Sequence, residues 1–143
     1  MTSQTVIAFI DGSCLGNPGE AGYGFVIQNE NGLVIEKQGR YIGKATNNVA
    51  EYRALLGCLE WARIHHVRSL SVFSDSLLLV QQVIGKYRVK EAHLKTLHAE
   101  VMARLKTLGA SFRITHLDRE NNKEADRLAR LAIRQRSEVQ ETS

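Results

Sequence analysis

The apolar positions at the start of the chain follow the pattern of β-strands. Residues 5–10 (TVIAFI) form a continuous apolar run, which is typical of a strand covered on both faces of a sheet. Residues 12–24 hold many of the glycines and the single proline, and we expect a loop there. Two further β-prone runs, 24–28 and 33–43, flank an Asn-Gly pair at 31–32, which is a strong hairpin signal. This part of the chain is therefore predicted to form an antiparallel meander of three strands.

Helical periodicity starts after the meander and then alternates with two more strand patterns. The apolar positions of residues 48–65 recur at helical spacing and predict an amphipathic helix. Further helices are expected over 77–85, 93–108 and 122–135, and further strands over 69–75 and 111–117. Because strands joined through helices run parallel, we expect an α/β fold: a mixed five-stranded sheet, with a three-strand antiparallel meander and two parallel strands, flanked by helices.

Length and composition are those of one ordinary globular domain. The chain has 143 residues, of which 43% are hydrophobic and 24% charged. We expect a single domain over residues 1–135 and a flexible polar tail over 136–143. No apolar run approaches the roughly 20 residues that cross a bilayer, and the N-terminus lacks the basic segment of a signal peptide. With free thiols expected at Cys14 and Cys58, these features predict a cytoplasmic protein without a membrane partner. We expect it to be a monomer.

Four acidic residues occupy positions that the predicted fold would bring to one place. Asp11 ends the most apolar strand, although an aspartate in front of a glycine would also fit a turn. Asp75 ends the next covered strand, and the carboxyl ends of parallel strands open onto the same edge of a sheet. Glu51 lies near the start of the helix between these strands, and Asp126 borders the apolar face of the last helix. The four carboxylates are therefore expected to converge.

Convergent carboxylates repel one another and need protons or cations to hold them together. Two of them about 4 Å apart cost on the order of 4 kcal/mol at an effective dielectric near 20. A ligand set of carboxylate oxygens favours hard divalent ions, Mg²⁺ or Mn²⁺, over zinc. If four of the fifteen acidic residues are neutralised in this way, eleven remain against nineteen lysines and arginines. The remaining surface would be basic and would suit a phosphate backbone.

Each of these acids also has a simpler interpretation when it is taken alone. Glu51 completes an N-x-x-E capping box with Asn48. Asp75 could cap the short helix that follows it. Asp126 could form an ordinary surface ion pair with Arg130, four residues later on the same helix. Capping and metal binding are compatible, and only the four positions together favour a metal site.

Four segments of the sequence resemble, in the same order, the motifs of type 1 ribonucleases H. They are IAFIDGSCLGNPGEAGYG (7–24), ATNNVAEYRAL (45–55), SVFSDSLLLVQQV (71–83) and ENNKEADRLAR (120–130), and each contributes one of the four acids. The resemblance extends over about residues 5–135 and implies a ribonuclease H-like fold. It is to a compact form of the family, because residues 85–93 are too short for the basic protrusion of some relatives.

The resemblance implies an endonuclease that hydrolyses the RNA strand of RNA/DNA hybrids with two Mg²⁺ or Mn²⁺ ions. Asp11 would bridge both ions, and Asp126 would help to hold the ion that activates the attacking water. Glu51 and Asp75 would hold the ion that stabilises the leaving 3′ oxygen. The products would carry 5′-phosphate and 3′-hydroxyl ends.

Two further groups of residues are implied by the same resemblance. In the family a histidine on a loop before the last helix assists turnover; His116 is the nearest match, and Arg119 is the alternative. Contacts with the RNA 2′-hydroxyls, the phosphates and the DNA strand are implied for a second group. Its members are Cys14, Asn17, Thr46, Asn47 and Asn48.

Three other functions fit parts of the pattern. A hybrid-binding module without activity would gain nothing from acids packed next to phosphates. A related nuclease of this fold could act on duplex RNA or on branched DNA. The implied 2′-hydroxyl contacts disfavour a DNA junction but leave duplex RNA open, because that substrate also carries 2′-hydroxyls. A carboxylate metal-storage or phosphohydrolase domain would make no use of the asparagine-rich segments or of the basic surface. The sequence therefore predicts hybrid cleavage first, with duplex RNA as a second substrate.

Overall fold

The protein is built on one mixed sheet of six strands with helices on both faces. We describe residues 4–141 from a computed structural model. Its elements are β1 (Gln4–Leu15), β2 (Gly19–Asn29), β3 (Val34–Ala45), α1 (Asn47–Ile64), β4 (Val67–Ser74), α2 (Leu77–Val83), α3 (Ala92–Leu108), β5 (Ser111–His116), the short 3-10 helix η1 (Arg119–Asn121), α4 (Lys123–Gln135) and β6 (Val139–Glu141). The strand order is β5-β4-β1-β2-β3-β6. The predicted antiparallel meander, β1 to β3, and the two parallel strands, β4 and β5, are confirmed.

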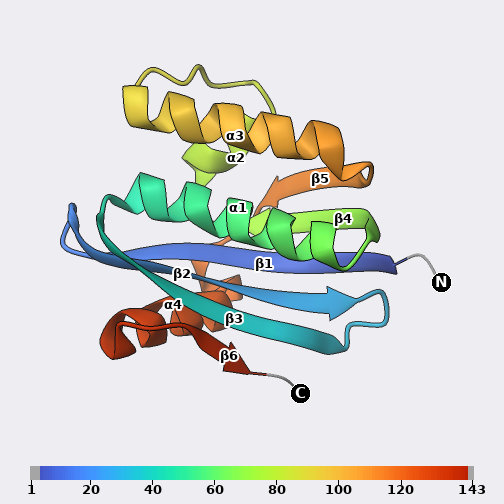
Figure 1. The fold of residues 1–143 in the computed structure, drawn as a ribbon, viewed down its shortest axis with the longest axis horizontal. Coiled ribbons are helices and arrows are strands. Elements are labelled where there is room, and N and C mark those ends of the chain that lie inside the picture. Colours follow the sequence, from blue (N-terminus) through green and yellow to red (C-terminus); the bar gives the residue numbers. More distant parts are fainter. Residues whose placement is uncertain (1–3, 142–143) are drawn as a thin grey trace.

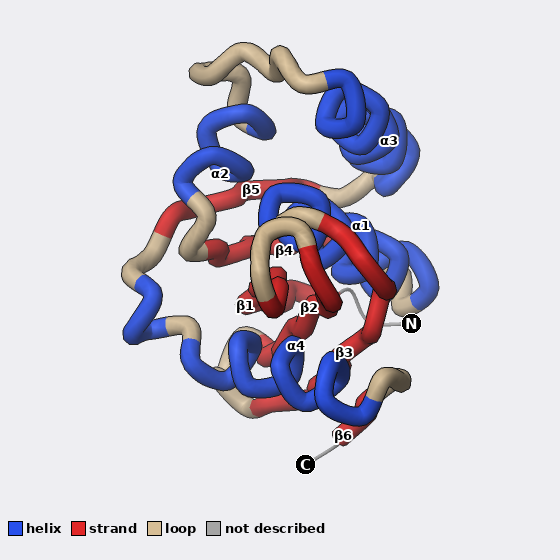
Figure 2. Tube along the Cα trace, turned by 90° about the vertical axis from the view of Figure 1, so that its left-hand side faces the viewer, coloured by secondary structure: helices blue, strands red, loops and turns tan. Residues whose placement is uncertain are grey.

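The helices divide between the two faces of the sheet (Figure 1). α1 packs on β1 and β2 from one face, with α3 against its outer side, and α4 covers β2 and β3 from the other. Figure 2 shows the strands end-on, between α4 and the α1–α3 pair. Cys14 and Cys58 are free thiols, as expected. Within residues 4–141 we find no helix that is long and apolar enough to cross a membrane.

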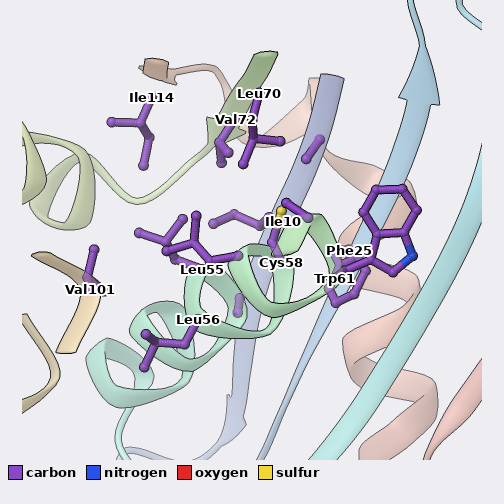
Figure 3. Close-up of a cluster of buried hydrophobic side chains, with 14 of the residues drawn as sticks. Ile10, Phe25, Leu55, Leu56, Cys58, Trp61, Leu70, Val72, Val101 and Ile114 are labelled. Atoms are coloured by element: carbon purple, nitrogen blue, oxygen red, sulfur yellow. The ribbon is translucent and has the colours of Figure 1, made fainter. Parts of the chain in front are cut away.

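The larger core lies between the sheet and α1 (Figure 3). Ile10, Phe25 and Val72 extend from three neighbouring strands toward the helix, where they meet Leu55 and Cys58. All five side chains are buried. The apolar face that the helical periodicity predicts is thus the face that covers the sheet. The α-helices begin and end within two residues of their predicted bounds.

The segment 12–24 differs from the loop that its glycines predict. β1 continues to Leu15, and residues 11–15 pair with β2, so that only a short turn remains between the strands. This pairing satisfies backbone hydrogen bonds in a stretch whose local propensity does not favour a strand. The parallel register of β1 with β4 ends at Ile10. Asp11 is therefore the first residue of β1 beyond its parallel neighbour.

A sixth strand lies in the segment 136–143, where the sequence predicts a flexible tail. β6 pairs antiparallel with residues 37–39 of β3, and Val139 is buried against Val26 and Leu128. Three residues carry too little local pattern to mark a strand, and the burial of Val139 depends on residues far away in the sequence. Residues 142–143 of the predicted tail lie outside the described residues.

Glycines in β2 and β3 allow α4 to rest directly on the sheet. A Cβ atom at Gly24 would lie 2.5 Å from the carbonyl oxygen of Ala125, and one at Gly39 would lie 2.4 Å from that of Leu128. Any larger residue at either position would push the helix away. This close packing brings the first turn of α4, which carries Asp126, toward the end of β1.

Replacing Val139 by alanine tests whether β6 is a packed part of the fold. The substitution removes buried methyl groups, and we expect it to lower the free energy of unfolding by about 1–2 kcal/mol in urea titrations. The matched control Ser137→Ala changes an exposed side chain and is expected to stay within about 0.5 kcal/mol of the wild type. Equal stability of the two variants would mean that the segment after α4 is not docked.

Candidate active site

Three of the four predicted acids converge at the carboxyl edge of the parallel strands. Asp11 comes from β1, Asp75 from the residue after β4, and Glu51 from the second turn of α1. Each offers a carboxylate oxygen, and these oxygens all lie within 4.8 Å of one another. Asp11 is 4% exposed, and so is the side chain of Asp75. Their meeting at this edge is what the order of strands and helices predicts.

Gly12 allows Glu51 to reach Asp11 from a different element. Its backbone N–H donates a hydrogen bond of 2.9 Å to Oε1 of Glu51. A Cβ atom at this position would lie 2.4 Å from the carbonyl carbon of Ala50 and 2.5 Å from the amide nitrogen of Glu51. Only glycine therefore lets β1 and α1 come this close. The Asp-Gly pair belongs to a strand, so the turn that it would also fit is not formed.

Other residues cap the two helices next to these acids. Oγ1 of Thr46 accepts a hydrogen bond of 3.2 Å from the backbone N–H of the third residue of α1. Oγ of Ser76 accepts one of 3.2 Å from the third residue of α2. The interpretations of Glu51 as the partner of Asn48 in a capping box, and of Asp75 as a helix cap, are therefore wrong. Both carboxylates remain available to a ligand.

Asp126 stands at the rim of the acidic cluster. Its carboxylate accepts a hydrogen bond of 3.0 Å from Nε of Arg130, so the predicted surface ion pair is present, and its side chain is 32% exposed. Together with Asp11, Glu51 and Asp75 it also lines a cavity of about 290 Å³. The structure thus brings all four acids to one cavity, three in a tight group and the fourth at its edge.

Burial and repulsion raise the pKa values of the two most enclosed acids. The pKa of Asp11 lies far above the usual range because the carboxyl is buried and because Glu51 and Asp75 are close. Burial and the charge of Asp75 also raise the pKa of Glu51, against the opposing effect of the hydrogen bond from Gly12. Without a metal these groups keep protons at a pH at which free carboxyls are ionised. A divalent cation would replace those protons.

Of the two candidates for an assisting side chain, Arg119 is the one at the cavity. It lines the cavity, and its Nε lies 3.7 Å from a carboxylate oxygen of Asp75, while its side chain is 90% exposed. His116 is the exposed last residue of β5 and is not among the residues that line the cavity. The short helix η1 after β5 brings the arginine to this position. Sequence spacing alone does not reveal that turn.

Three of the five residues with implied substrate contacts line the cavity, and the other two lie next to them in the chain or in space. Cys14, Asn47 and Asn48 line it. Asn17 lies on the turn between β1 and β2, and its Oδ1 accepts a hydrogen bond of 3.1 Å from the backbone N–H of Asn47. Thr46 caps α1 next to them. The turn after β1 and the start of α1 are thus joined into one surface beside the acids.

Asn122, directly before α4, is a buried residue of this region that the sequence does not single out. It is 2% exposed, and its Nδ2 donates a hydrogen bond of 2.8 Å to the carbonyl oxygen of Ile10. An asparagine in front of a helix is the usual sign of an N-cap. Nothing in the local sequence distinguishes that role from a bond to a distant strand.

The sequence and the fold resemble those of known ribonucleases H. Residues 9–132 match the reverse transcriptase-like protein family. The crystal structure of LC11-RNase H1 in complex with an RNA/DNA hybrid gives a TM-score of 0.89 at 37% identity, covering 92% of this chain and 99% of that one. RNase H1 from the halophilic archaeon Halobacterium salinarum gives 0.87 at 34% identity, covering 92% and 98%. The chain belongs to the type 1 ribonuclease H family.

Some relatives of this ribonuclease H domain are longer proteins. The bifunctional protein Rv2228c of Mycobacterium tuberculosis is 38% identical over 132 residues, which are 90% of this chain but 35% of that protein. Ribonuclease HI of Halobacterium salinarum is 37% identical over 129 residues, covering 90% of this chain and 64% of that protein. The chain therefore spans about a third to just under two thirds of the length of these curated relatives.

The acids of this ribonuclease H domain fit a divalent metal site. The close group of three offers only carboxylate oxygens, which are the ligands that Mg²⁺ and Mn²⁺ prefer. Burial, followed by the neighbouring carboxylates, raises the pKa values of Asp11 and Glu51, so a bound cation would be needed to keep both groups ionised near neutral pH. Asp11, Glu51 and Asp75 are thus the residues that would hold an ion, with Asp126 approaching from the rim.

Replacing Glu51 by glutamine is expected to stabilise the metal-free protein. The amide keeps an acceptor for the N–H of Gly12 but removes one charge from the cluster. A gain of about 1–2 kcal/mol, or a few degrees in melting temperature, is expected in EDTA near pH 8. Because the folded-state pKa values of Asp11 and Glu51 are raised, the metal-free wild type loses stability as pH rises from about 4 through those raised values. The gain should therefore grow with pH.

Thermal melts across this pH range, with and without Mn²⁺, check the expectation. Glu30→Gln is the matched control, because Glu30 lies exposed in the turn between β2 and β3. If Glu51→Gln melted below the wild type in EDTA at every pH, the role of Glu51 in tying α1 to β1 would outweigh the repulsion.

Proposed function

We propose that this ribonuclease H domain is an endonuclease that hydrolyses the RNA strand of RNA/DNA hybrids. The observation that carries the proposal is the group of Asp11, Glu51 and Asp75, whose oxygens lie within 4.8 Å in a cavity that Asn47 and Asn48 also line. A purely binding domain would be harmed by such a group, which repels phosphates. The similarity to LC11-RNase H1, which was crystallised with an RNA/DNA hybrid, supports this substrate.

Two Mg²⁺ or Mn²⁺ ions are the proposed cofactors. Asp11, the most enclosed acid, would contribute oxygens to both sites, Glu51 and Asp75 to one, and Asp126 to the other. A pair of such ions supplies activation of a water and stabilisation of the leaving 3′ oxygen in an in-line displacement at phosphorus. Asp126 would have to exchange its ion pair with Arg130 for this role. The proposed products carry 5′-phosphate and 3′-hydroxyl ends.

The basic remainder of the surface would draw the hybrid onto this acidic cavity. The chain has nineteen lysines and arginines and fifteen acidic residues, and four of these acids line the cavity. The rest of the surface therefore carries an excess of positive charge, which attracts phosphates. We propose that Cys14 and Asn17 lie along the RNA strand, where 2′-hydroxyls distinguish RNA from DNA. Thr46, Asn47 and Asn48 would contact the phosphates and the DNA strand. Duplex RNA offers the same hydroxyls and is the second candidate substrate. A cytoplasmic monomer stays the expectation from the sequence.

We further propose that Arg119, in place of His116, assists turnover. Its side chain extends over the cavity beside Asp75. A guanidinium donates charge-assisted hydrogen bonds to phosphate oxygens, and because this one is largely exposed, it can follow a phosphate that enters or leaves. His116 ends β5, where the sheet fixes the direction of the chain.

A cleavage assay with four end-labelled substrates tests the proposed activity. With Mg²⁺ or Mn²⁺ we expect the wild type to cut the hybrid and to leave single-stranded RNA and duplex DNA intact, while duplex RNA decides the second substrate. Asp11→Asn should lower the rate by more than about 100-fold, since even residues that only support metal ligands cost about 10- to 100-fold. EDTA should abolish cleavage. Hybrid cutting that survives Asp11→Asn in a folded protein would refute the proposal.

The role of Arg119 is tested by comparing two alanine variants at saturating hybrid. Arg119→Ala should lower kcat by about 10- to 100-fold, the equivalent of one charge-assisted hydrogen bond. His116→Ala, the matched control, should stay within about twofold of the wild type. The opposite order of the two rates would return the assisting role to the histidine.

A further inference from the structure

Asn122 is a buried polar residue whose contacts the proposed chemistry does not yet use. Its Nδ2 donates a hydrogen bond of 2.8 Å to the carbonyl oxygen of Ile10, and both groups are buried. Its Oδ1 is also buried and has no hydrogen-bond partner among residues 4–141. An unpartnered acceptor in the interior is unfavourable. Only one of the two polar atoms of the side chain is hydrogen-bonded, so hydrogen bonding of the side chain alone does not explain why it is buried here.

Helix capping does not supply that explanation. Asn122 occupies the N-cap position of α4, where an asparagine oxygen usually accepts a hydrogen bond from the second or third residue of the helix. The side chain makes no such bond here. Its amide instead reaches β1, 112 positions earlier in the chain. The side chain of Asn122 thus does not cap α4 but connects the start of α4 to β1.

Two hydrogen bonds of Asn122 connect the backbone beside Asp11 with the backbone of Asp126. Ile10, which accepts from Nδ2, directly precedes Asp11. The carbonyl oxygen of Asn122 accepts a hydrogen bond of 3.2 Å from the amide nitrogen of Asp126. One residue therefore links the strand that carries the most enclosed acid to the helix that carries the acid at the rim.

The same residue ends the segment that brings Arg119 to the cavity. The amide nitrogen of Leu117 donates a hydrogen bond of 3.0 Å to the carbonyl oxygen of Ser74 at the end of β4. At the other end of residues 117–122, Asn122 is bound to β1. The segment is thus fastened to β4 and to β1, and Arg119 lies between the two attachments. A loss of the second attachment would remove the hydrogen bond that ties the start of α4 to the residue before Asp11.

We propose that Asn122 is a positioning residue that holds Asp126 at the distance from Asp11 at which both serve one metal site. The proposal rests on the proposed function, since it concerns the same acids. Asn122 acts through α4 and through the backbone of β1. Its removal should weaken metal binding because Asp126 is no longer held, and the effect should disappear when the carboxylate of Asp126 is already gone.

Mn²⁺ titration calorimetry on the full chain tests the proposal without substrate. Asn122→Ala and Asn122→Ser should each lower Mn²⁺ affinity by about tenfold or more, the effect usual for residues that orient metal ligands. Serine is the informative variant, because it restores a good N-cap but is too short to replace the bond to Ile10. Asn121→Ala is the matched control: Asn121 is exposed, and the variant should bind within about twofold of the wild type.

A double variant decides whether Asn122 acts through Asp126. In an Asp126→Asn background, Asn122→Ser should lower Mn²⁺ affinity by less than about twofold further, because the carboxylate that it positions is already lost. Wild-type affinity in Asn122→Ser would overturn the proposal, and so would losses that multiply in the double variant. If Asn122→Ala does not fold, the serine variant, which can still cap α4, carries the test.

The outcomes separate this inference from the proposed function. A wild type that binds Mn²⁺ but leaves the hybrid intact would refute the function, and the calorimetric comparison would still decide the role of Asn122. A wild type that cuts the hybrid, with Asn122→Ser binding Mn²⁺ equally well, would refute only the positioning role. Failure of the wild type to bind Mn²⁺ would overturn both.

Discussion

Carboxylate repulsion at the carboxyl edge of the sheet is the constraint around which the site is built. Two such charges about 4 Å apart cost on the order of 4 kcal/mol at an effective dielectric near 20, and Asp11, Glu51 and Asp75 lie within 4.8 Å of one another. The core next to them supplies the opposing stability. Ile10 directly precedes Asp11, and Leu55 follows Glu51 by one helical turn; both are fully buried. Apolar packing therefore fixes the backbone on which the repelling groups stand.

Glycines decide how closely the acids from different elements approach. α1 meets the sheet at Gly12, where a Cβ atom would collide with the helix backbone, and α4 meets it at Gly24 and Gly39 for the same reason. Both helices that carry an acid to the edge of the sheet are thus placed by contacts between backbones. Because a backbone contact does not depend on protonation, the geometry of the cluster is set before any ion enters. The carboxylates of Asp11, Glu51 and Asp75 would thus already lie close together when an ion binds.

The sequence predicts the parts of the structure that depend on local periodicity. The helices, the meander and the convergence of Asp11, Glu51 and Asp75 follow from apolar spacing and from the rule that parallel strands end at one edge. Strand β6 has only three residues, and the last part of β1 contains a glycine that does not favour a strand. Both segments are extended because they pair with another strand of the sheet, so no local pattern marks them.

The sequence also does not show which of two possible roles a polar side chain takes. Glu51 and Asp75 each fit a helix cap, and only the positions of Thr46 and Ser76 show that the caps are already provided. The same ambiguity hides Asn122, whose bond to a distant strand replaces a local one. In each case one polar side chain could cap its own helix or contact a more distant element, and only the tertiary structure shows which of the two it does.

The two arginines at the cavity form ion pairs with Asp75 and Asp126, but they do not offset the charge around Asp11. Arg119 lies 3.7 Å from Asp75 and Arg130 lies 3.0 Å from Asp126, and their side chains are 90% and 59% exposed. Ion pairs this exposed contribute little and are screened by salt, so an entering cation would displace them easily. The charged groups that act most strongly on Asp11, by contrast, are all carboxylates. Asp11 can therefore be neutralised only by a proton or a bound cation, which is why the proposed metal site centres on it.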